Sequence, residues 1–126
     1  MPVARMVQPS CNPVTLKDGR GGIFTFIPGV PVVEWSVLFT KAGEYRGFHL
    51  HKEFGEFVTV TSGHGAYWTL DGDLRQTWKM GPGDCIFFPP ETPHTFVAIS
   101  DVSMVACLTK KWDDCEEPIT PVDFDG

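Results

Sequence analysis

Short runs of alternating, β-branched and aromatic residues recur along the chain, and each is closed by a turn signal. Typical turn signals are Pro28-Gly29, Asp71-Gly72 and Gly81-Pro82, because these residues adopt the backbone angles that tight turns need. Many short strands with short connections predict antiparallel pairing inside one closed barrel or sandwich, which hides the strand edges. The expected strands cover residues 22–27, 33–41, 46–51, 56–61, 64–70, 74–80, 85–88, 94–99 and 103–109.

Both ends of the chain lack this alternation. Residues 1–13 carry three prolines and are expected to form an irregular N-terminal arm, residues 14–109 the barrel, and residues 110–126 an acidic tail with one helical turn around residues 112–117. The length of 126 residues fits a single domain. The four cysteines show no CxxC spacing, which favours buried free thiols.

Charge and hydropathy exclude several classes of partner. Sixteen acidic and ten basic residues give a net charge of −6, which argues against a nucleic-acid-binding face. No apolar run approaches the length of a membrane span, and the first residues do not form a signal peptide. We therefore expect a cytoplasmic protein whose partner is a small molecule.

Three of the four histidines stand where they could act together. His49 and His51 are two residues apart on an expected strand, so both imidazoles point to one face. Glu56 begins the next strand, and His94 opens a much later one. Neighbouring imidazoles need partners for their nitrogens when buried, and a divalent metal supplies that partner.

The wider spacing is specific. The first pattern is Gly43-x5-His49-x-His51-x4-Glu56-x6-Gly63, and the second is Gly83-x5-Pro89-x4-His94. These resemble the two sequence motifs of the cupin superfamily. The second motif departs from the usual pattern at Glu91, where glycine is usual, and at Ala98, where asparagine is usual.

The resemblance implies an all-β, small single-domain cupin, that is, a double-stranded β-helix or jelly-roll barrel with a metal inside one mouth. Carried over position by position, the metal ligands are His49, His51, Glu56 and His94. Such nitrogen and oxygen ligands suit one divalent transition metal ion, whether Fe, Mn, Ni, Co or Zn. They also leave a coordination position open for a substrate oxygen or a water.

A narrower resemblance surrounds the first motif. The segment from Arg46 to Lys52, RGFHLHK, is similar to the RG-x-H-x-H-K segment of cupins that rearrange nucleotide-linked keto sugars, the 3,4-ketoisomerases and 3,5-epimerases. It implies that Arg46 and Lys52 bind substrate, since guanidinium groups match phosphate oxygens. If the histidines hold a metal, another group must move the proton. The candidates, which the sequence does not rank, are Tyr45, Tyr67 and Glu56.

Three functions follow from this pattern. The first is a metal-dependent isomerase or epimerase of a small polar carbonyl compound, such as a sugar or nucleotide sugar. The second is an Fe(II)-dependent dioxygenase, and the third a non-catalytic module that binds a small ligand. We also expect a homodimer that associates through sheet edges near residues 22–27, because exposed edges need cover.

Overall fold

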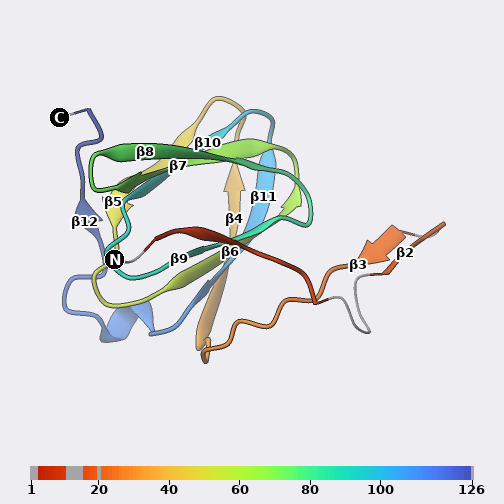
Figure 1. Ribbon diagram of the computed structural model, residues 1–126, viewed down its shortest axis with the longest axis horizontal. Helices are drawn as coiled ribbons and strands as arrows, with labels where there is room; N and C mark the ends of the chain where they lie inside the picture. Colours follow the sequence, from red (N-terminus) through yellow and green to blue (C-terminus); the bar gives the residue numbers. More distant parts are fainter. Residues whose placement is uncertain (1–2, 11–15, 20, 126) are drawn as a thin grey trace.

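Two five-stranded antiparallel sheets face each other and enclose a core, as the computed structural model shows (Figure 1). The structure describes residues 3–10, 16–19 and 21–125. The first sheet has the order β1-β9-β6-β11-β4, with β1 (Arg5–Val7), β9 (Cys85–Phe88), β6 (Glu56–Ser62), β11 (Val102–Leu108) and β4 (Glu34–Thr40). The second has the order β12-β5-β10-β7-β8, with β12 (Thr120–Pro121), β5 (Tyr45–Leu50), β10 (His94–Ala98), β7 (Gly65–Asp71) and β8 (Leu74–Met80). This arrangement confirms the all-β expectation.

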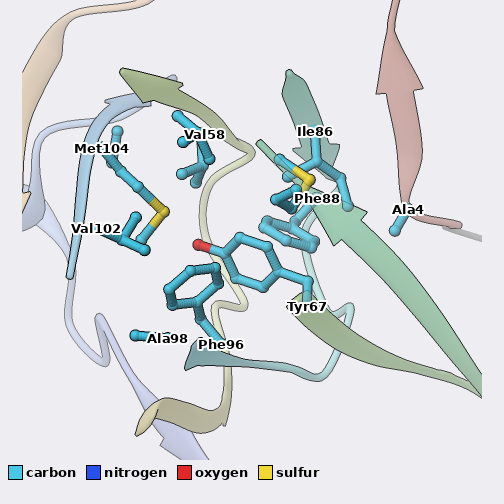
Figure 2. Packing of buried hydrophobic residues seen from close by; sticks show 12 residues of the cluster. Ala4, Val58, Tyr67, Ile86, Phe88, Phe96, Ala98, Val102 and Met104 are labelled. Carbon is cyan, nitrogen blue, oxygen red and sulfur yellow. The ribbon is translucent and has the colours of Figure 1, made fainter. Parts of the chain in front are cut away.

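Alternation along the strands decides which side chains enter the core. In β11 the side chains at Val102, Met104, Ala106 and Leu108 are buried, and those between them are half-exposed. Figure 2 shows the ring of Tyr67 among the buried side chains, near Phe88 and Phe96, with its hydroxyl directed toward the side of Met104 and Val102. This apolar filling stabilises the barrel, since each buried large side chain contributes roughly 1.5–3 kcal/mol.

The N-terminal part of the chain differs from the expectation in two places. An irregular arm is wrong for Arg5–Val7, which forms β1 and pairs with the edge of β9 while Val7 is buried. A strand over residues 22–27 is wrong beyond Ile23, because only Gly21–Ile23 forms a strand, β3. Its partner is β2 (Leu16–Asp18), and the two form a hairpin that projects from the barrel (Figure 1). Residues 11–15 lie outside the described residues.

The C-terminal segment is part of the sheet structure. The expected helical turn is present as a short 3₁₀ helix, η1 (Trp112–Asp114). After it, β12 pairs with the end of β5, where Thr120 lies opposite Leu50 and Pro121 opposite His49. The tail is thus anchored beside the end of β5, which carries His49 and leads directly into His51.

Cys85, Cys107 and Cys115 are free thiols, as expected, but of these only Cys85 is buried, and Cys107 and Cys115 are half-buried. Cys11 lies outside the described residues. Within the described part of the chain, no helix has both the length and the apolar character needed to cross a membrane.

Candidate metal centre

The candidate site lies at one end of the barrel, where β5 ends and where β6 and β10 begin. Antiparallel pairing brings these strand ends together, because His94 lies opposite His49 on β5. Glu56, the first residue of β6, reaches the same place from the facing sheet. Four side chains from three separate strands and one loop therefore converge, although up to 45 positions separate them in the chain.

The three imidazoles are close enough to share one ion. Their ligand atoms all lie within 4.8 Å of one another. The ring centroid of His49 is 4.7 Å from that of His51 and 4.8 Å from that of His94. His51 and His94 are buried, and His49 is half-buried.

Aromatic side chains support two of these rings. The ring of Phe88 stacks on His94 at a centroid distance of 4.2 Å and an interplanar angle of 9°. The ring of Phe54 stacks on His51 at 4.4 Å and 25°. Packing of this kind limits the rotamers of the two histidines and holds their nitrogens in place.

Backbone carbonyls set the tautomers of the same two rings. Nδ1 of His51 lies 2.8 Å from the carbonyl oxygen of Pro118, and Nδ1 of His94 lies 2.9 Å from that of Thr92. A carbonyl oxygen only accepts hydrogen bonds, so each Nδ1 carries the hydrogen and donates it. Nε2 of both rings is then the nitrogen that faces the centre of the site, as in metal-binding histidines held by outer partners.

Glu56 completes the arrangement. Its Oε1 lies 3.5 Å from Nε2 of His51 and 3.4 Å from Nε2 of His94. Burial alone would raise the pKa of this carboxyl group, but hydrogen bonds from the two histidines outweigh burial and hold its pKa well below the usual range. Glu56 is therefore an ionised carboxylate in a mostly buried place.

The pKa values of His49 and His51 are shifted in opposite directions. Burial, together with the charges of His94 and His51, lowers the pKa of His49 to about 4. Burial would also lower the pKa of His51, but the hydrogen bond and charge of Glu56 more than compensate and raise it. His49 is consequently neutral at pH 7, which is the form that binds a metal.

This donor set fits a divalent cation. In the neutral form that binds a metal, with the hydrogen on Nδ1, the rings of His51 and His94 would each direct an Nε2 lone pair toward the negatively charged Oε1 of Glu56. Acceptor atoms that face each other in a buried site need a positive charge between them, either protons or a metal ion. Three imidazoles and one carboxylate, all borderline or hard ligands, suit a transition metal, so the cluster could bind such an ion.

A β-bulge in β5 determines which face of the sheet Tyr45, one of the two candidate tyrosines, lies on. Phe48 is the extra residue between the pairs His94–His49 and Thr95–Gly47, and its φ is 59°. The bulge reverses the faces of the residues that precede it.

Tyr45 consequently lies on the outer face of the second sheet. It is half-exposed and stacks on Phe48 at a centroid distance of 5.9 Å. Tyr67 is buried, and its ring centroid lies 6.2 Å from that of His94. Burial, and to a lesser extent the charge of Glu56, raises the pKa of Tyr67 well above its usual value. The structure thus places Tyr67, and not Tyr45, beside the histidines.

The two basic residues predicted to bind substrate make bonds within the chain. Nε of Arg46 donates to Oγ1 of Thr40 at 2.9 Å, and its NH2 group donates to the carbonyl oxygen of Phe39 at 2.8 Å. Nζ of Lys52 forms an ion pair with Glu117 at 3.1 Å. Arg46 thus joins β5 to the edge strand β4, and Lys52 holds the tail.

Two functional contacts escaped sequence reasoning. The carbonyl oxygens of Pro118 and Thr92 orient two of the candidate ligand histidines, yet every residue has a carbonyl group, so no residue type marks this role. Thr92 had an indirect signal, because it lies two positions before His94. Pro118 is 67 positions from His51, and only the fold brings the two together.

Comparison with known proteins agrees with this architecture. Residues 37–109 of the chain match the sequence model of the Cupin domain family. This span includes all four candidate ligands. No curated protein matches the chain at a significant level of sequence similarity.

Solved structures share the fold at low sequence identity. A 3,4-ketoisomerase from Helicobacter canadensis has a TM-score of 0.79 and 17% identity, over 97% of this chain and 92% of that one. A dTDP-6-deoxy-D-glucose-3,5-epimerase from Legionella pneumophila, in complex with dTDP-4-keto-L-rhamnose, has a TM-score of 0.77 and 14% identity, over 98% and 79%. A sugar 3,4-ketoisomerase from Thermoanaerobacterium thermosaccharolyticum, in complex with TDP, has a TM-score of 0.76 and 12% identity, over 88% and 83%.

Proposed function

Because the chain belongs to the cupin family, we propose that it is a metal-dependent enzyme that isomerises or epimerises a small polar carbonyl compound of the sugar type. One divalent transition metal would be held by His49, His51, Glu56 and His94. The observation that carries this proposal is the pair of Nε2 atoms directed at Oε1 of Glu56, with both Nδ1 atoms bonded to backbone carbonyls. A bound divalent ion would polarise a carbonyl oxygen of the substrate.

The residues of the chain account for the remaining requirements of such a reaction. Isomerisation moves a hydrogen between neighbouring carbons, so one group must take a proton from the first carbon and a donor must protonate the second, and no oxidant is needed. We assign the ionised carboxylate of Glu56 as the group that takes up the first proton. Tyr67 keeps its hydroxyl hydrogen at neutral pH because burial and Glu56 raise its pKa. We assign Tyr67 as the proton donor on this ground and on its position 6.2 Å from His94, measured between ring centroids.

Metal content tests the ligand assignment. We expect close to one transition metal ion per chain, measured by elemental analysis after gentle purification. His51→Ala should lose the metal and keep the barrel, because the ligands are local to one end of the fold. His64→Ala is the matched control, since His64 lies against Gly81 and outside the site. Full metal content in His51→Ala would contradict the assignment.

Hydrogen exchange tests the reaction. A panel of free ketoses and aldoses, incubated with the metal-loaded protein in D₂O under nitrogen, should exchange the hydrogen on the carbon next to the carbonyl, as seen by proton NMR. Exchange without net oxidation supports the isomerase. Oxygen consumption that depends on Fe(II), with no exchange under nitrogen, would instead support the dioxygenase.

We also propose that two copies of the chain associate through the edge strand β4. Trp35, Val37 and Phe39 lie at alternate positions of this strand and are 74%, 54% and 70% exposed. An apolar row on an open edge is typical of a surface that a second copy covers. Light scattering should show a dimer that Val37→Glu dissociates. Ile99→Glu, at an exposed apolar residue in the bend after β10, should leave the dimer intact.

A further inference from the structure

A small cavity opens directly beside Glu56. It has a volume of about 340 Å³ and lies between β4, β11 and the short helix η1. Its lining includes Glu34, Leu38, Glu56, Leu108, Trp112 and Asp113. Since Oε1 of Glu56 contacts Nε2 of His51 and of His94, a molecule in this cavity is next to the metal ligands.

The charged side chains among the described lining residues of this cavity are all acidic. Three carboxylates, on Glu34, Glu56 and Asp113, line it, and no lysine or arginine is among its described lining residues. Two nearby lysines are engaged elsewhere, because Lys110 pairs with Glu53 and Lys52 with Glu117. Lys111, the residue before η1, is not among the lining residues. A divalent ion in the site has half of its charge matched by Glu56, so the outer cavity keeps the negative potential of Glu34 and Asp113.

Trp112 gives the cavity an aromatic wall. Its indole is 38% exposed, and its ring centroid lies 6.0 Å from that of His51 and 6.1 Å from that of Phe54. The backbone N–H of Trp112 donates to Oε1 of Glu34 at 3.3 Å, which fixes the helix against β4. An aromatic face flanked by carboxylate acceptors suits a molecule with C–H surfaces and several hydroxyl donors.

We infer that the site admits an uncharged, monosaccharide-sized ligand rich in hydroxyl groups, and that it rejects phosphorylated sugars and nucleotide diphosphates. This inference rests on the proposed function, because it names the substrate class of the same site. The volume is near the lower end of the roughly 300–1,000 Å³ of small-molecule pockets. A diphosphate that extends outward from a metal in the site would meet Glu34 and Asp113, and like charges in a binding site repel one another.

The basic residue that a phosphate would need lies elsewhere. Arg46 lines a different cavity, of about 690 Å³, at the end of β4 that carries Thr40. Its guanidinium is already bonded to Thr40 and to the carbonyl oxygen of Phe39. The substrate specificity of this chain is thus distinct from that of the neighbours solved with TDP or a dTDP-linked sugar.

Binding of matched probes tests the inference. D-fructose, D-fructose 6-phosphate and dTDP are titrated into the zinc-loaded full chain at low salt, and NMR follows the Trp112 indole N–H with the amides of Ala106 and Leu108. We expect D-fructose to shift these signals and the two phosphorylated probes to leave them unchanged at the same concentration. A panel of other free hexoses accompanies D-fructose, and failure of every free sugar to bind overturns the inference.

Charge removal sharpens the test. The double variant Glu34→Gln/Asp113→Asn should gain at least about fivefold in affinity for D-fructose 6-phosphate, and about 0.5 M salt should give the wild-type chain a similar gain by screening. The control Glu44→Gln/Asp73→Asn removes two exposed carboxylates outside the cavity and should change nothing. If the double variant fails to fold, Asp113→Asn alone, at an exposed position of η1, replaces it. Tighter binding of dTDP than of every free sugar at Trp112 overturns the inference.

The proposed function and the inferred ligand class can be contradicted independently of each other. Metal content and hydrogen exchange are measured on the same samples. A chain that binds no metal yet shifts Trp112 with free sugars removes the proposed function and leaves the ligand class standing. A metal-loaded, active chain that binds dTDP more tightly than free sugars supports the proposed function and contradicts the inferred ligand class.

Discussion

Nδ1 of His51 lies 2.8 Å from the carbonyl oxygen of Pro118, so a residue of the acidic tail orients the imidazole of a candidate metal ligand. The same segment pairs with β5 through Thr120 and Pro121. The tail therefore belongs to the site, because the outer partner of a ligating histidine fixes its tautomer and its direction.

Removal of this partner should weaken metal binding. A chain that ends at Glu117 lacks the Pro118 carbonyl and β12, and we expect its zinc affinity to fall by about 10- to 100-fold. A chain that ends at Pro121 keeps both and serves as the control. Competition with a chromogenic chelator measures the two affinities, and equal values for the two truncations would show that Pro118 has no part in orienting His51.

The two tyrosines offer a matched pair for the proton-transfer step. Tyr67→Phe removes the hydroxyl of the ring that lies 6.2 Å from His94, measured between centroids, and should lower the rate of C–H exchange by about 10²- to 10⁴-fold, the usual contribution of general acid–base catalysis. Tyr45→Phe removes a hydroxyl on the outer face and should leave the rate unchanged. The same NMR assay in D₂O measures both, with zinc content as the check that the site is intact. Loss of exchange in Tyr45→Phe alone would reverse the assignment.

Glu91 stores backbone strain that glycine would release. Its φ is 71°, a left-handed conformation that costs a residue other than glycine about 1 kcal/mol. The hydrogen bond from its N–H to the carbonyl oxygen of His51, at 2.7 Å, holds it there.

We expect Glu91→Gly to be more stable than Glu91→Ala by about 1 kcal/mol, because alanine keeps the strain and both variants lose the same carboxylate. Urea unfolding of the metal-free chains measures the difference. Equal midpoints would mean that the strain at this position is negligible.

Low pH should loosen the contacts that hold the acidic tail, residues 110–126, against the barrel. The N–H of Glu117 and then the hydrogen bond from Lys110 lower the pKa of Glu53, and the hydrogen bond from Lys52 lowers that of Glu117. Carboxyls with a lowered pKa in the folded state stabilise it above their ordinary value of about 4.5. That contribution disappears as the pH falls through the folded pKa.

Between pH 6 and pH 3, the tail amides should therefore lose hydrogen-exchange protection before the strands of the barrel do. Glu53→Gln should remove most of this pH dependence, and Glu44→Gln, at an exposed turn, should retain it. A tail whose protection does not change over this range would contradict the ion-pair account.

The spacing of the histidines was enough to locate the candidate site. His49, His51 and His94 stand in fixed relation to turn glycines, and the structure brings their ligand atoms within 4.8 Å of one another. The strand pattern also located the barrel from β4 to β11, because alternation and turn residues are local signals. Glu91 shows that the motif carried backbone information as well, since the position where glycine is usual adopts a positive φ.

Features that depend on contacts between distant segments could not be predicted from the alternation and turn residues of the sequence. Strict alternation along β5 places Tyr45 on the face of His49 and His51, and the bulge at Phe48 reverses that order. The backbone of Thr95 approaches Gly47 so closely that a Cβ there would lie 2.6 Å from Cα of Thr95. No residue type earlier in the sequence predicts this close approach. The contact between Pro118 and His51 likewise joins segments that are distant in the chain.

The two carbonyl partners of the histidines differ greatly in their distance along the chain. Thr92 holds His94 from two positions away, within one turn, whereas Pro118 holds His51 across 67 positions. Local opening of a terminal segment requires far less free energy than global unfolding. Departure of the tail would thus free His51 while the other side of the site stays rigid. A metal ion bound there would then exchange on the timescale of that opening rather than on the timescale of barrel unfolding.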